Sequence, residues 1–159
     1  MLRCRYEVRH GDPLPMRTLC LLLSLLSTSP VNADAKKDLE KLQGSWVQES
    51  LTEDPNVKRQ GKEWTYVEVK GNRMAITFGN GNTMTPTITL DASKSPAHID
   101  FTFEAGKRKD KKWEGIYRVD GDKMTLCFPV EPDSKPRPTA FKTSTDSGLR
   151  MVVLKREKK

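Results

Sequence analysis

The sequence is poor in the residues that most often carry catalysis and metal binding. It contains 2 histidines and 3 cysteines in 159 residues. Its strongest apolar run, residues 19–26, is less than half the length of about 20 residues that a membrane-spanning helix needs. These scarcities disfavour a helical membrane protein, a disulfide-rich scaffold and a histidine-based metal site.

The short apolar run has the surroundings of a signal peptide. Arg17 precedes it, and the small-residue motif Ala33-x-Ala35 follows it. A positive residue, a short apolar segment and an A-x-A motif together are typical of a secretory leader. We expect Met16 to be the true start and cleavage to occur near Ala35.

The predicted organisation is therefore a leader over residues 1–35, including an upstream extension, and a single domain over residues 36–159. Such a protein is exported to the periplasm or the extracellular space, without a transmembrane segment.

Removal of the leader takes away two cysteines and one histidine, and leaves Cys127 and His98. A single cysteine forms no internal disulfide, and we expect Cys127 to be a buried small apolar residue. A Cys127/His98 pair has no orienting third group in the pattern, and no ligand spacing for a metal is visible. Asp120-x-Asp122 is predicted to be a hairpin turn rather than a calcium loop. The sequence predicts a protein that is not an enzyme and has no cofactor.

After a short helix predicted within residues 34–44, apolar and polar residues alternate along most of the chain. In residues 123–128, Met124, Leu126 and Phe128 alternate with Lys123, Thr125 and Cys127. This period of two indicates antiparallel strands with one buried face. The predicted strands are 45–53, 64–70, 73–78, 83–90, 98–104, 113–119, 123–129, 138–143 and 149–156.

Turn sequences separate these strands, and Pro86 indicates an edge or a bulge within one of them. Many short strands in a meander avoid open edges by closing on themselves. The predicted fold is all-β: a small antiparallel up-and-down barrel of about 8 strands with a short N-terminal helix.

The first strand resembles the opening of the lipocalin and calycin barrels, in which a helical turn leads into Gly-x-Trp. Here the motif is Gly44-x-Trp46. The resemblance implies that Trp46 plugs the closed end of a barrel and that a basic residue of the last strand covers it. Arg156 is the candidate for this cover, and Arg150 is the alternative.

A second resemblance covers the predicted domain. The segments DLEKLQGSWVQES, SPAHIDFTF, GIYRVDGDKMTLCF, RPTAF and MVVLKRE occur in the order found in a family of exported planctomycete-type bacterial domains of unknown function. This resemblance implies a lipocalin-like barrel and supplies no catalytic residues.

Two functions remain open. In the first, the barrel binds a small apolar ligand or a partner surface. The apolar residues expected to line such a site are Ile76, Phe78, Ile88, Phe101, Phe103, Tyr117, Leu126 and Phe128. Their bulk and the short strands also allow a filled interior that carries nothing.

In the second, the protein is a structural or interaction module of the cell envelope. The segment GKRKDKKW, residues 106–113, is strongly basic within a chain of net charge +7. Its cations could contact an anionic envelope component, with Trp113 as a stacking surface. The alternative is a solvated loop whose lysines discourage edge pairing. The candidate anion-contacting residues are Lys107, Arg108, Lys109, Lys111 and Lys112.

Overall fold

The computed structural model describes residues 30–56 and 63–158, in which one α-helix precedes a nine-stranded antiparallel sheet. The elements are α1 (Pro30–Leu42), β1 (Gly44–Glu53), β2 (Trp64–Lys70), β3 (Arg73–Phe78), β4 (Thr83–Met84), β5 (Thr87–Asp91), β6 (Ala97–Thr102), β7 (Lys112–Asp120), β8 (Lys123–Pro129) and β9 (Leu149–Arg156), with a single 3-10 turn, η1 (Gly106–Arg108), before β7. Most of the predicted leader lies outside the described residues.

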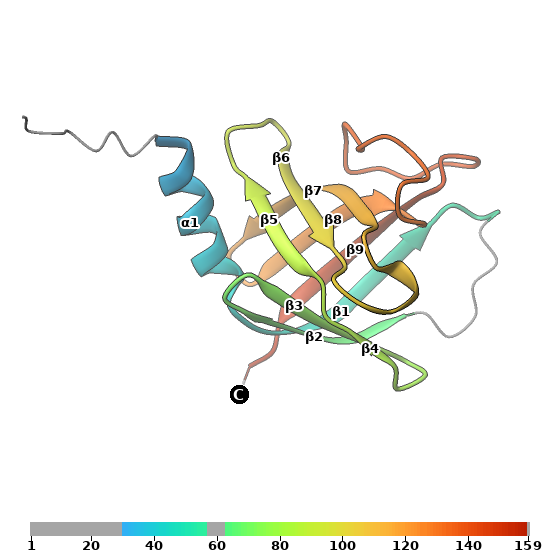
Figure 1. Cartoon of the computed structure of the whole chain (residues 1–159), viewed down its shortest axis with the longest axis horizontal. Helices are drawn as coiled ribbons and strands as arrows, with labels where there is room; N and C mark the ends of the chain where they lie inside the picture. The colour runs from blue at the N-terminus through green and yellow to red at the C-terminus, as the bar shows by residue number, and fades with distance from the viewer. Residues whose placement is uncertain (1–29, 57–62, 159) are drawn as a thin grey trace, which may run out of the picture.

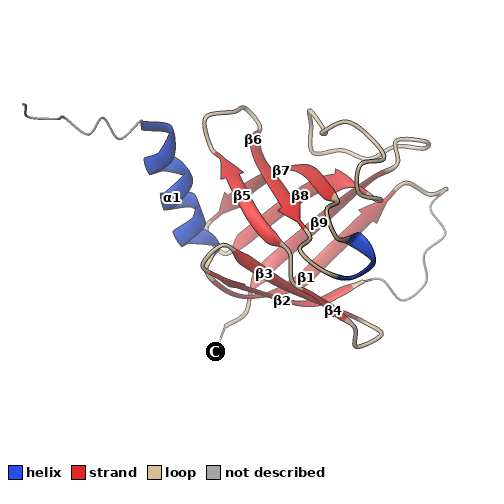
Figure 2. Ribbon diagram, in the orientation of Figure 1, coloured by secondary structure: helices blue, strands red, loops and turns tan. Residues whose placement is uncertain are grey.

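The sheet closes into a barrel. The strand order is β2-β1-β9-β8-β7-β6-β5-β3-β4, and the additional pairing of β2 with β3 completes the ring. Eight strands form the closed barrel, and the two-residue strand β4 is an extra partner of β3. Figures 1 and 2 show α1 at one end of the barrel, away from the β3–β4 hairpin. The predicted antiparallel barrel with an N-terminal helix is confirmed.

Two predicted strands differ from the structure. The predicted strand 83–90 is divided into β4 and β5, because Pro86 has no N–H to continue the ladder. Residues 138–143 form no strand. They lie instead in an irregular segment between β8 and β9, where the Arg137 guanidinium donates to the backbone oxygens of Ile99 and Gly115.

The barrel interior is filled by side chains from the inward positions of every strand. Within it Phe128 contacts Trp64, Phe101 and Trp113, with ring-centroid distances of 5.5, 5.6 and 5.3 Å. Contacts between tilted or stacked rings at these distances are favourable beyond the area that they bury. The alternation read from the sequence therefore produces a core of packed rings.

The segment between β8 and β9 covers part of the outer face. Ile116 and Cys127, which are neighbours in the β7–β8 register, are both 0% exposed although they point away from the interior. Arg137 also forms an ion pair of 2.6 Å with Asp100, and Arg118 lies 5.2 Å from the centroid of the Phe141 ring. Cys127 is buried, as the sequence suggested, but under this segment rather than inside the barrel.

No helix within residues 30–56 and 63–158 has the length and apolarity needed to span a membrane.

Candidate functional site

The end of the barrel next to α1 is closed by Trp46 and Arg156. Trp46 is 0% exposed, and its indole N–H donates a 2.9 Å hydrogen bond to the Leu42 carbonyl at the end of α1. The register pairs Trp46 directly with Arg156, whose guanidinium carbon lies 4.2 Å from the centroid of the Trp46 rings. This is the arrangement expected from the Gly-x-Trp resemblance.

Arg156 also binds the C-terminal end of α1. Its Nη1 and Nη2 donate hydrogen bonds of 2.8 and 2.7 Å to the carbonyls of Gln43 and Lys41. Gly44 has φ +106°, and a Cβ added there would lie 3.3 Å from the Arg156 Nη1. Glycine therefore permits both the positive φ and the close approach of the guanidinium. One arginine both covers the tryptophan and satisfies carbonyls that the helix leaves free.

A second contact attaches α1 to the barrel wall. The hydroxyl of Tyr117, a residue 2% exposed, donates a 2.8 Å hydrogen bond to the Asp38 carboxylate. Burial and this hydrogen bond raise the pKa of Tyr117 well above its ordinary value. The helix is thus fixed over the closed end of the barrel.

The opposite end contains a gap in the barrel wall. β3 and β5 share one register pair, Arg73 with Thr87, and on either side of this pair the Met74 N–H donates to the Pro86 carbonyl and the Ile88 N–H donates to the Asn72 carbonyl. Beyond this point β3 pairs with β4, whereas β5 pairs with β6. The proline therefore separates the two ladders, and a space opens between β4 and residues 103–108.

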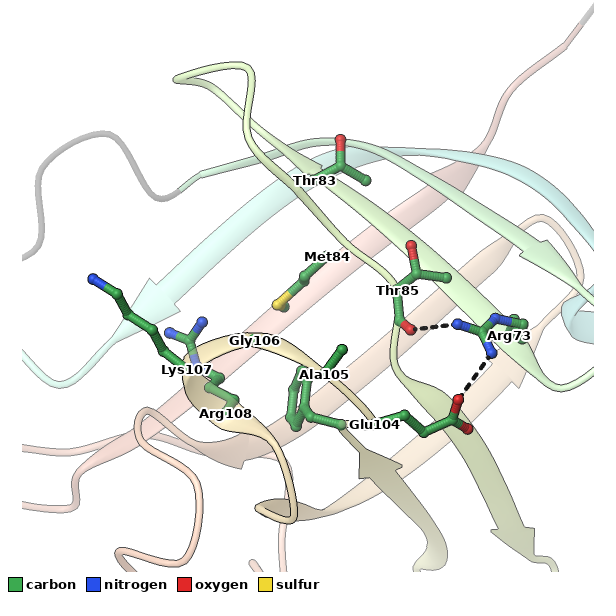
Figure 3. Close-up of a pocket in the computed structure, with 10 residues that line it drawn as sticks. Arg73, Thr83, Met84, Thr85, Glu104, Ala105, Gly106, Lys107 and Arg108 are labelled. Carbon is green, nitrogen blue, oxygen red and sulfur yellow. Dashed lines mark hydrogen bonds and ion pairs between the residues drawn. The ribbon is translucent and has the colours of Figure 1, made fainter.

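The first of two adjoining cavities lies in this gap. Its volume is about 420 Å³, and its walls come from β3, β4 and the β6–β7 connection. Figure 3 shows the Met84 side chain pointing toward η1, with Lys107 and Arg108 on one side of it. On the other side Arg73 donates to the Thr85 carbonyl and to Glu104, at 3.3 Å each.

The second cavity, of about 380 Å³, lies toward the barrel interior and shares Thr83, Met84, Lys107 and Arg108 with the first. The residues that line it are Phe78, Asn80, Asn82, Thr83, Met84, Lys107, Arg108, Trp113 and Arg150. We call this second space the mouth cavity. It combines three apolar side chains with amides, a hydroxyl and three cations.

Arg150 is the least expected residue of the mouth cavity. It is 2% exposed and forms an ion pair with Glu53. Its Nε has no hydrogen-bond acceptor among the described residues, and the same is true of the Trp113 indole N–H. A buried donor without an acceptor costs about 1–3 kcal/mol.

The alternative role of Arg150 as the cover of Trp46 is wrong, because Arg150 is at the opposite end of β9 and pairs in register with Glu53.

Electrostatic conditions at Arg150 are unusual for an arginine. Burial lowers its pKa, the Glu53 carboxylate acts in the opposite direction, and the charge of Arg108 lowers the pKa further. Arginine nevertheless stays protonated in proteins. Two guanidinium groups therefore repel each other across the mouth cavity, and the Glu53 carboxylate is bound to one of them.

The basic segment 106–113 does not act as one surface. Lys107 and Arg108 line the cavities, while Lys109 and Lys111 are exposed. Lys112 turns to the outer face, where its Nζ lies 2.7 Å from Asp100 and 3.5 Å from Glu114.

Trp113 was expected to offer a stacking surface, and that interpretation is wrong. Trp113 is 2% exposed because β7 alternation turns it inward. Its ring packs against Phe103 and lies 5.5 Å from the Arg108 guanidinium carbon. A base or sugar ring therefore has no free indole face to stack on.

The predicted ligand-lining residues fall into two groups. Phe78 lines the mouth cavity, Phe103 lines the first cavity, and Ile88 lines a separate hollow beside α1. The remaining members are buried in the core; they are Ile76, Phe101, Tyr117, Leu126 and Phe128. Among them Phe101 and Phe128 contact each other, as described above, and fill part of the interior in which a deeper ligand would lie.

His98 and Cys127 share the outer face but do not meet. The register places Ile116 between them, because His98 pairs with Ile116 and Ile116 pairs with Cys127. Two strand spacings separate their backbones by about 10 Å. Burial also raises the pKa of the Cys127 thiol to about 11, which opposes nucleophilic reactivity. In the part of the chain that the structure describes, no group of three or more potential ligands could hold a metal ion.

We compared the chain with protein-family models, with curated proteins and with solved structures. None of them matches. The resemblances drawn from the sequence motifs therefore stay predictions, and the mouth cavity must be interpreted from its own chemistry.

Sequence reasoning assigned neither Met84 nor Arg150 to the mouth. The inward position of Arg150 follows from the alternation along β9, because Arg150 precedes the inward residues Val152 and Leu154 by two and four positions. An arginine in an inward position of a barrel strand is expensive to bury and often marks a site.

Proposed function

We propose that this protein is a non-enzymatic binding barrel that holds a small, partly apolar molecule in the mouth cavity. The observation that carries the proposal is the gap between β4 and residues 103–108, beside which a concave space of about 380 Å³ is lined by the half-buried Met84 and Phe78 and by the edge of the buried Trp113. Small-molecule sites typically have such volumes and combine apolar walls with a few polar groups.

The arrangement of the core favours the mouth over the deep interior. A ligand that entered more deeply than the mouth cavity would have to displace rings that contact one another at about 5.5 Å. A ligand in the mouth cavity displaces no described side chain from the core. We therefore propose a shallow site, in which the ligand lies over the ring cluster rather than among its members.

Export remains part of the proposal. Cleavage near Ala35 would divide α1, but the helix residues that hold the barrel lie after this position. Leu42 is buried in the core, Leu39 packs against it, and Asp38 accepts the hydrogen bond from Tyr117. The processed chain would thus keep the closed end. Mass spectrometry of the protein recovered outside the cytoplasm tests this, and a mass that retains the residues before Ala35 would contradict it.

Binding can be tested with octanol, a small neutral amphiphile. In ¹⁵N-labelled protein, octanol should shift the Trp113 indole and Met84 amide resonances in a saturable manner. The Trp46 indole, which is at the closed end and bonded to Leu42, serves as an internal control and should not move. Saturable shifts confined to the closed end would contradict a mouth site.

A matched pair of variants sharpens this test. Met84→Gln replaces an apolar wall of the mouth cavity and should weaken octanol binding by about tenfold, because the octanol chain would then lie against a polar amide that has to be desolvated. Met151→Gln makes the same change on β9 at a half-buried position that does not line the cavity. Equal effects of the two substitutions would refute the assignment.

A further inference from the structure

The mouth cavity is positively charged as well as apolar. Lys107, Arg108 and Arg150 line it, and one of these cations, Arg150, is paired with the Glu53 carboxylate. Glu104 is turned away, since it accepts hydrogen bonds from Arg73 and Thr87 on the other side of Met84 (Figure 3). Three cations against one carboxylate leave an excess of positive charge in a partly enclosed space.

Two hydrogen-bond donors of the lining residues also lack acceptors. They are the Nε of the almost fully buried Arg150 and the indole N–H of Trp113, neither of which has an acceptor among the described residues. A cavity that holds only apolar molecules gains nothing from such donors, because burying polar groups without partners is unfavourable. A ligand that carries acceptor oxygens would satisfy both donors.

The geometry points to an organic carboxylate as the ligand of the mouth cavity, with its carboxylate between Arg108 and Arg150 and its apolar part against Met84, Phe78 and Trp113. Guanidinium groups match carboxylates in shape and can bind them through two parallel hydrogen bonds. The ligand charge also relieves the repulsion between the two arginines. This inference rests on the proposed function, because it requires that a small molecule enters the mouth cavity at all.

Comparing octanoate with octanol separates the contribution of the ligand's negative charge from that of its apolar chain, because the two molecules have the same chain length and differ in the head group. At neutral pH octanoate is ionised, and we expect it to bind about ten to one hundred times more tightly than octanol. The Trp113 indole N–H resonance reports both titrations.

Arg108→Gln should weaken octanoate binding by about tenfold and change octanol binding by less than about twofold. Arg108 is partly exposed and belongs to η1, so this variant should fold. Arg118→Gln is the matched control, because it removes the same charge and a similar contact with an aromatic ring on the outer face. It should leave both affinities unchanged.

Arg150 is tested as a pair with Glu53, since removing one partner would leave the other buried and unpaired. The double variant Glu53→Gln/Arg150→Met should retain octanol binding and lose the preference for octanoate. Thermal unfolding of the double variant shows whether it is folded. If it is not folded, Arg108→Gln alone tests whether the preference for octanoate depends on the cations of the mouth cavity.

The outcomes distinguish the two proposals. If neither probe shifts the Trp113 resonance, the proposed function fails. If octanoate and octanol bind equally and Arg108→Gln changes neither, the carboxylate inference fails while the binding function stands. A preference for octanoate that disappears in Arg118→Gln would place the anion on the outer face and would also overturn the inference.

Discussion

Replacing Arg156 tests the closed end of the barrel. Arg156→Met keeps an unbranched side chain over Trp46 but removes two hydrogen bonds to the carbonyls of Lys41 and Gln43 and the guanidinium over the indole. At this partly exposed position we assign about 1 kcal/mol to each hydrogen bond and about 0.5–1 kcal/mol to the cation–π contact. The longer ion pair with Asp122, at 3.5 Å, should add little. The expected loss is therefore about 2.5–3 kcal/mol.

The assay is urea denaturation followed by tryptophan fluorescence, with Arg156→Lys and Arg118→Met as comparisons. Lysine restores the charge but cannot reach both carbonyls with a planar fork, so we expect a loss of about 1–2 kcal/mol. Arg118→Met removes an exposed guanidinium from the Phe141 ring and should cost about 0.5 kcal/mol. If Arg156→Met costs no more than Arg118→Met, the interpretation of Arg156 as a structural cover is wrong.

Two further predictions concern the barrel wall. Gly115→Ala should destabilise the protein by about 1–3 kcal/mol, because the added Cβ would lie 2.8 Å from the Cys127 carbonyl oxygen. Gly79→Ala, whose nearest contact would be 3.9 Å away, is the control and should change stability little; equal effects in urea would contradict the packing described. For Tyr117, the raised folded-state pKa means that its stabilising contribution is present below pH 10 and is lost as pH rises toward the folded value. Tyr117→Phe also loses the hydrogen bond to Asp38. Between about pH 9 and pH 11, its urea midpoint should therefore fall less steeply with pH than that of the wild-type protein. The same dependence of the midpoint on pH in both proteins would refute this prediction.

Much of the fold followed from local patterns. The strands β2, β3, β8 and β9 have the predicted bounds, because alternation and turn residues specify both their buried faces and their ends. Pro86 was expected to mark an edge or a bulge within strand 83–90, whereas it divides that segment into β4 and β5. The predicted strand 138–143 was wrong because its conformation depends on contacts distant in the chain, chiefly those of Arg137 with Ile99 and Gly115.

The mouth cavity was less predictable than the fold. Alternation shows that Arg150 and Arg156 are on one face of β9, but it does not show which of them meets Trp46. That depends on the register between β1 and β9, which includes a bulge between Gln48 and Ser50. The basic segment 106–113 was visible in the sequence. Which of its cations line the cavity and which lie on the outer face depends on the residue at which β7 begins, because strand alternation from Lys112 onward turns Lys112 outward.

The central claim is that the mouth cavity carries a small molecule. Native mass spectrometry of the protein purified from the organism that encodes it tests this claim most directly, with Met84→Gln expressed in parallel. We predict an additional mass in a one-to-one ratio that is lost on denaturation and is strongly reduced in the variant. A wild-type protein that has the mass of the polypeptide alone would contradict the claim.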